Sequence, residues 1–104
     1  MPDTVHLKIH SMQGKIFVSC CDRDLLGQQY SDGKCCLRIP ESFYKGTEMD
    51  LASACDVIEE HMDRADSIQI IGENIIEHLD GRNVMCMDGV RRVKGVPHLI
   101  FIRM

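Results

Sequence analysis

The order of apolar and polar residues divides the chain into an early part that favours strands and a later part that contains helices. Val5 to His10 alternates apolar with polar residues, which is the period-two pattern of a half-buried strand. A short turn at residues 11–14 separates it from a second run at 15–21, so the two are predicted to form a hairpin. A third strand is expected from Lys34 to Ile39, where Pro40 stops it.

Short connecting structures are expected between these strands and the helical part. Asp22 can cap one helical turn at residues 23–26, which Gly27 would end. The segment Phe43-Tyr44-Lys45-Gly46 is predicted to be a tight connector with its aromatic rings turned inward.

From Asp50 to about Ala65 the period changes to that of an amphipathic helix. Its apolar residues fall on one face, and its acidic residues fall away from that face. Ser67–Ile71 is then predicted to be a strand, followed by a second helix from Glu73 to about Asp80, with Gly81 at its C′ position. Two further strands are expected at 84–87 and 98–103.

Early local pairing followed by helices predicts an α+β fold. We expect a two-layer sandwich in which a mainly antiparallel or mixed sheet carries two main helices on one face. At 104 residues, without repeats or a linker, residues 1–104 are expected to form a single domain.

Composition adds an expectation about location. No run approaches the roughly 20 apolar residues that span a bilayer, so no membrane association is expected, and the first residues lack the basic and apolar regions of a secretory signal. Six cysteines without such a signal indicate a reducing compartment, where buried thiols are more common than disulfides. The sequence therefore predicts a soluble cytoplasmic protein.

Charge is unevenly distributed along the chain. The formal net charge is −4, but residues 89–104 carry four basic and no acidic side chains, which leaves −8 on the rest of the chain. General attraction to nucleic acid is therefore not expected, because the overall charge sets the long-range field. A local basic patch at Arg91, Arg92 and Lys94 is a candidate contact for phosphate, although the same side chains could simply be solvated in a loop.

The segment Gly95-Val96-Pro97-His98 follows that patch directly. Pro97 has a fixed φ and restricts Val96 to extended geometry, while Gly95 permits a left-handed backbone. Gly95 and Pro97 are thus predicted to form a rigid turn that holds the His98 imidazole in a reproducible position. Two interpretations of His98 stay open: a hydrogen bond to a buried backbone group, or contact with a ligand, partner or proton.

No catalytic or metal-binding constellation is recognisable. The doublets Cys20-Cys21 and Cys35-Cys36 cannot chelate as they stand, because adjacent strand residues point to opposite faces. Zinc-protease, serine-hydrolase and phosphate-loop motifs do not occur. We assign no catalytic residue, no metal ligand and no cofactor, and an enzymatic role is not favoured. Aromatic residues are also few, so RNA binding by stacking would require Tyr30, Tyr44 or Phe101 to be exposed.

Several short segments resemble an uncharacterised archaeal family, the domain of unknown function 424. The resemblance implies an archaeal cytoplasmic protein with a small two-layer α+β fold, and it implies no activity, because the family has no established one. The segments are spread in order over nearly the whole chain: Cys21-Asp22, Leu25-Leu26-Gly27, Gly33-Lys34, Phe43-Tyr44-Lys45-Gly46, Ile71-Gly72-Glu73 and Gly95-Val96-Pro97-His98.

Three function hypotheses follow. The first is a non-enzymatic binding module, associated with RNA or with a ribosome- or translation-associated protein, that uses Arg91, Arg92, Lys94 and the His98 turn. The second is a protein-interaction or structural module that binds through a strand edge or an apolar patch. The third is a small enzyme or metal protein that uses His98 with a cysteine. The apolar patch of the second hypothesis would contain Met85, Met87 and Met104.

Overall fold

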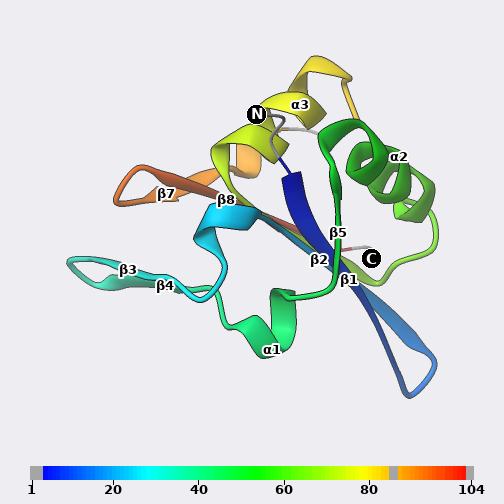
Figure 1. Ribbon diagram of the computed structural model, residues 1–104, viewed down its shortest axis with the longest axis horizontal. Coiled ribbons are helices and arrows are strands. Elements are labelled where there is room, and N and C mark those ends of the chain that lie inside the picture. The colour runs from blue at the N-terminus through cyan, green and yellow to red at the C-terminus, as the bar shows by residue number, and fades with distance from the viewer. Residues whose placement is uncertain (1–3, 85–86, 103–104) are drawn as a thin grey trace.

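The centre of the molecule is a mixed six-stranded sheet (Figure 1). The computed structural model describes residues 4–84 and 87–102. Strands β2 and β6 are parallel and every other neighbouring pair is antiparallel, so the predicted antiparallel or mixed sheet is confirmed. In spatial order the strands are β5 (Thr47–Asp50), β1 (Thr4–Met12), β2 (Lys15–Asp22), β6 (Ser67–Ile71), β8 (Val96–Ile102) and β7 (Arg91–Val93).

One face of the sheet is covered by two helices, α2 (Leu51–His61) and α3 (Glu73–Gly81). The Asp50 carboxylate begins α2 by accepting a hydrogen bond from the backbone N–H of Ser53 at 2.7 Å. The main apolar core fills the space between these helices and the sheet, which confirms the two-layer α+β architecture. Its central members are Val5, Leu7, Val18, Cys20, Ala54, Cys55, Ile58, Ile68, Ile70, Ile75, Leu79 and Leu99.

The other face is partly covered by an excursion of the chain between β2 and β5. It contains a short 3₁₀ turn (Arg23–Leu25), the hairpin of β3 (Gln29–Asp32) and β4 (Cys35–Arg38), and the single-turn helix α1 (Glu41–Tyr44). The predicted inward orientation of the aromatic segment is confirmed for the buried Tyr44. A second apolar cluster lies beneath this excursion, formed by Cys21, Leu37, Ile39, Tyr44 and Ile71.

Two hairpins of the sheet turn in the same way. Gln13 and Gly14 join β1 to β2, and Lys94 and Gly95 join β7 to β8. All four residues have positive φ, between 52° and 81°. This is the pattern of two-residue type I′ turns, whose twist matches that of the flanking strands.

Several local predictions were wrong. β3, β5 and β7 were not predicted as strands, and the basic run that could have been a solvated loop is instead an edge strand. Val84 lies outside any strand and Met87 begins a 3₁₀ turn (Met87–Gly89); the two residues between them lie outside the described part. Gly81 is the last residue of α3, and Asn83 rather than Gly81 takes the left-handed conformation. Within residues 4–84 and 87–102, no helix is long and apolar enough to cross a membrane.

Candidate functional site

The β7–β8 hairpin places Arg91 and His98 directly opposite each other on the face of the sheet that carries the excursion. Opposed side chains in an antiparallel pair have Cβ atoms about 5 Å apart. Lys94 stands in the turn, and its side chain and that of Arg91 are exposed. All four predicted binding residues are therefore on one hairpin, and Arg91 and His98 are neighbours on the same face.

The His98 imidazole is half-buried and has no hydrogen-bond partner in the described part of the chain. It therefore does not secure the turn through a backbone group. The turn is held by its neighbour, because Pro97 is buried and its carbonyl accepts a hydrogen bond from the N–H of Gly72 at 3.0 Å. Burial lowers the pKa of His98 below its usual value, so the ring is neutral near pH 7 and can both donate and accept a hydrogen bond.

Arg92 lies on the opposite face and does not join the other basic residues. Its guanidinium donates to both carboxylate oxygens of Glu73, at 2.8 and 3.3 Å, and to the carbonyl of Gly95 at 3.1 Å. The same contacts hold the pKa of the Glu73 carboxyl below its usual range. The charge of Arg92 is thus largely matched within the molecule, and its contacts tie the hairpin to α3.

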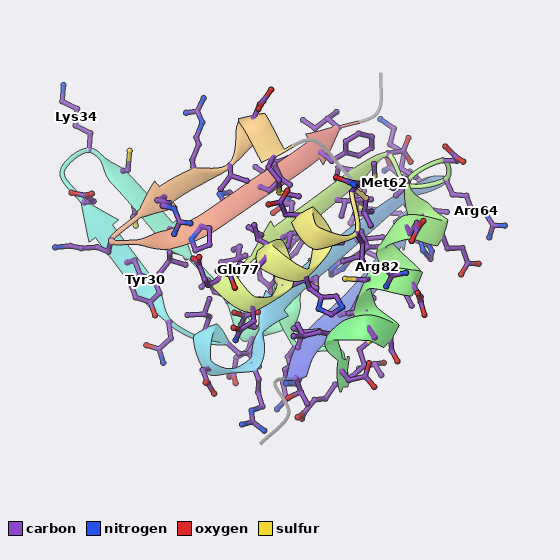
Figure 2. All side chains as sticks on the ribbon, turned by 90° about the horizontal axis from the view of Figure 1, so that it is seen from above. Tyr30, Lys34, Met62, Arg64, Glu77 and Arg82 are labelled. Atoms are coloured by element: carbon purple, nitrogen blue, oxygen red, sulfur yellow. The ribbon has the colours of Figure 1, made fainter. Side chains whose placement is uncertain are left out.

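The structure adds basic residues that sequence reasoning missed. The β3–β4 hairpin packs beside β7, and Figure 2 shows Lys34 at its far end. Lys34 and the β4 residue Arg38 are both exposed. More than fifty positions separate them from Arg91 and Lys94, so no local pattern could have grouped the four side chains.

A small cavity lies beside the turn of the β7–β8 hairpin. Its volume is about 230 Å³, and four of the segments that carry the family resemblance meet there. Most of its polar atoms already have partners. It is lined by Asp22, Asp24, Leu25, Glu73, Asn74, Gly95, Val96 and Pro97.

Asp22 is the most constrained of these residues. Its carboxylate accepts hydrogen bonds from the backbone N–H groups of Asn74 at 3.0 Å and Ile75 at 3.1 Å, so it caps α3. The prediction that it caps the turn directly after it was wrong, since that turn has no side-chain cap. Gly72, with φ of 129°, allows this approach, because a Cβ there would collide with the Asp22 carboxylate.

A serine–histidine pair on the same sheet face is structural. Nε2 of His10 lies 3.1 Å from Oγ of Ser19 and 3.0 Å from the carbonyl oxygen of Phe43, and Ser19 donates to that carbonyl at 2.9 Å. A carbonyl only accepts, so Nε2 must carry the hydrogen and cannot take the proton of Ser19. The network holds α1 against the sheet, with the Phe43 ring stacked on His10 at 4.5 Å.

The cysteines among the described residues divide into two groups. Cys20, Cys21 and Cys55 are buried, and burial raises the pKa of Cys21 to about 12, so its thiol stays protonated. Cys35 and Cys36 are exposed; a hydrogen bond from the Ser31 hydroxyl lowers the pKa of the Cys36 thiol. Among the described residues, no group of three His, Cys, Asp or Glu side chains could hold a metal ion.

The aromatic and methionine candidates are mostly engaged in packing. Tyr44 is buried, Phe101 packs against the main core, and the half-buried Tyr30 packs against the second cluster. Met87 also packs against the main core, whereas Met85 and Met104 lie outside the described residues. The exposed large apolar side chains of the described part are Ile9, Met12, Ile100 and Ile102.

Comparison with known proteins gives a family and a fold. A family model described as a protein of unknown function, DUF424, matches residues 10–104. A crystal structure of an uncharacterized conserved protein from Methanopyrus kandleri is similar at a TM-score of 0.79 and 27% identity, covering 94% of this chain and 90% of that one. No curated protein matches.

Proposed function

This chain belongs to the DUF424 family of proteins of unknown function, and we propose that it is a non-enzymatic module that binds the phosphate backbone of RNA. The binding site is the double-hairpin surface, which we define as Lys34, Arg38, Arg91, Lys94 and His98. One observation carries the proposal: the β3–β4 hairpin contacts β7, so two basic residues from each of two distant segments lie on adjoining hairpins.

The availability of these charges supports the proposal. Lys34, Arg91 and Lys94 form no salt bridge in the described part of the chain, and the one acidic residue of the two hairpins there is Asp32. Phosphate contacts of this kind hold a nucleic acid in place without reading its sequence. Opposite Arg91, the neutral His98 ring offers one further donor or acceptor, suited to a ribose hydroxyl.

The rest of the surface favours approach from this side. The outer face of α2 carries the exposed residues Asp56, Glu59 and Glu60, and Figure 2 places Arg64 and Arg82 at that opposite end of the molecule. Arg82 binds Asp56 and Glu59, and Arg64 lies 3.5 Å from Glu60. A polyanion is repelled by an acidic face and attracted by a basic one, so the charge distribution orients RNA towards the hairpins.

The test is a filter-binding titration against total RNA at several salt concentrations. We expect Arg91→Ala/Lys94→Ala to reduce the slope of log K against log salt by about two, one for each phosphate that is no longer neutralised, and Lys34→Ala/Arg38→Ala to do the same. The matched control is Lys45→Ala/Arg64→Ala, which removes the same charge from other surfaces and should leave the slope near the wild-type value. Equal slopes in all three variants would contradict the proposal.

The cellular context is part of the same proposal. We place the protein in the cytoplasm, with ribosomal RNA or a translation-associated ribonucleoprotein as the class of partner. Competition separates this class from any polyanion: ribosomal RNA should displace labelled RNA at lower concentration than heparin does. Displacement by heparin at equal or lower charge concentration would reduce the role to general polyanion binding.

A further inference from the structure

We propose that the free edge of β1 is a docking site for an extended, acidic segment of a partner protein, which adds to the sheet as a strand in line with β5. β1 is nine residues long, but β5 pairs only with its first four, Thr4–Leu7. In the part of the chain that the structure describes, no strand pairs with residues 8–12 on that edge. Figure 1 shows this end of the β1–β2 hairpin projecting from the body of the molecule.

Gly46, directly before β5, explains why β5 covers only part of the β1 edge. A Cβ at this position would collide with the Leu7 carbonyl oxygen and with the Lys8 side chain. The chain thus comes from α1, which packs on the excursion face, and meets β1 closely at Gly46, so that β5 begins only at Thr47. The edge beyond Lys8 is left with unpaired backbone groups, which is the feature that recruits an added strand.

A cavity beside this edge can receive a side chain. Its volume is about 390 Å³, and it lies between β1, β5 and α2. The exposed fraction of Ile9 is 48%, which is large for an isoleucine next to the main core. An apolar side chain from an added strand would cover it. The cavity is lined by Leu7, Lys8, Ile9, Gly46, Thr47, Met49 and Val57.

The two sides of the edge differ in chemistry, and this difference specifies the occupant. Leu7 and Ile9 point to the helix side, whereas Lys8 and His10 point to the excursion side. Successive residues of an added strand point to opposite faces, so every second side chain would meet the apolar cavity. The others would lie on the side of Lys8, whose ammonium donates to the Ser42 carbonyl at 2.9 Å. An alternation of apolar and acidic residues fits both sides.

Charges near the edge support an acidic partner. Lys8 lines the cavity, Lys45 is next to Gly46, and Lys15 lies opposite Met12 at the hairpin tip. The carboxylate of Glu48, on the neighbouring β5, is already bound by the Thr4 hydroxyl at 2.8 Å and approached by Arg23 at 3.6 Å. Three lysines therefore lie along the open edge, although the whole chain is acidic.

The experiment uses a fluorescein-labelled hexapeptide that alternates glutamate with leucine, added to the full chain. We expect a rise in anisotropy and slower amide hydrogen exchange within residues 8–12, measured by NMR. Ile9→Lys should weaken binding by about tenfold or more, since it removes one buried apolar contact. The matched control is Ile102→Lys, an equally drastic change at an isoleucine that is 64% exposed on another strand, and it should bind as the wild type does.

Two further arms keep the test independent of folding defects and of the RNA site. A peptide with N-methylated backbone amides should not bind the wild-type protein, because it cannot donate hydrogen bonds to the edge. Arg91→Ala/Lys94→Ala should leave peptide binding unchanged. The peptide proposal can therefore fail while the RNA proposal holds, and the RNA proposal can fail while the peptide proposal holds.

Three results would overturn the proposal. The first is no anisotropy change, or exchange protection outside residues 8–12. The second is an N-methylated peptide that binds as tightly as the unmodified one, or an Ile102→Lys variant whose affinity for the peptide falls as much as that of Ile9→Lys. The third is a concentration-dependent dimer whose protection falls on residues 8–12 without peptide, since a second copy of this chain would then be the occupant.

Discussion

The two faces of the sheet are covered in different ways. On one face, α2 and α3 lie over a continuous apolar layer that includes Ile58, Ile70 and Leu79. On the other face, the excursion is attached through polar contacts as well as a smaller apolar cluster, among them the Tyr44 hydroxyl donating to Gln69 at 3.1 Å. The difference indicates that the helix face supplies most of the stability, while the excursion face positions the hairpins that we propose bind RNA.

The largest expected effect tests that division directly. Ile70→Ala on the fully buried helix face should lower the free energy of unfolding by about 2–5 kcal/mol, because it removes apolar contacts and leaves a cavity. Ile100→Ala, on the adjacent strand but on the other face and about half exposed, should change it by less than about 0.5 kcal/mol. Urea denaturation measures both; similar decreases would show that the two faces contribute equally to stability.

A smaller effect is expected at the attachment of the excursion. Tyr44→Phe removes the hydrogen bond to Gln69 and should cost about 1 kcal/mol, with faster amide exchange in α1 and little change in α2. Tyr30→Phe is the control, since its hydroxyl has no partner among the described residues. If Tyr44→Phe accelerates exchange equally in both helices, the excursion is not a separate unit of stability.

The smallest effect concerns His98 and pH. Burial lowers its pKa in the folded state, whereas the unfolded value is about 6.5. Below pH about 6.5 the unfolded chain therefore binds more protons than the folded one, and stability falls as the pH is lowered towards the folded pKa. His98→Gln should lose less stability over that interval. An NMR titration of the His98 ring with a midpoint at or above 6.5 would contradict this.

Much of the architecture was predictable because it is encoded in local periodicity. The period-two pattern at 5–10 and the helical pattern after Asp50 each identify a buried face, and β1 and α2 were predicted from them. β2, β6 and α3 were predicted from short apolar runs and from the residues that bound them. β3, β5 and β7 have only three or four residues each, which is too short for a period to be recognised. They are strands because a neighbouring strand supplies their hydrogen bonds.

The candidate site was predictable in part for the same reason. The prediction of a rigid turn rested on what Gly95 and Pro97 permit at the backbone, and such preferences are local. The partner of a charged side chain is not local. Arg92 was grouped with Arg91, yet alternation along β7 sends it to the opposite face, where Glu73 binds it.

The sequence by itself therefore determined the α+β class, the amphipathic helices and a turn at Gly95 next to a basic run, because each depends on neighbouring residues. Only the tertiary structure decided that Asp22 caps α3 across 52 positions, that Lys34 and Arg38 lie on the hairpin beside Arg91, and that β1 keeps an open edge. These features depend on which distant segments pack together. Which segments pack together depends on the free energy of the whole core, so it cannot be predicted from a short stretch of sequence.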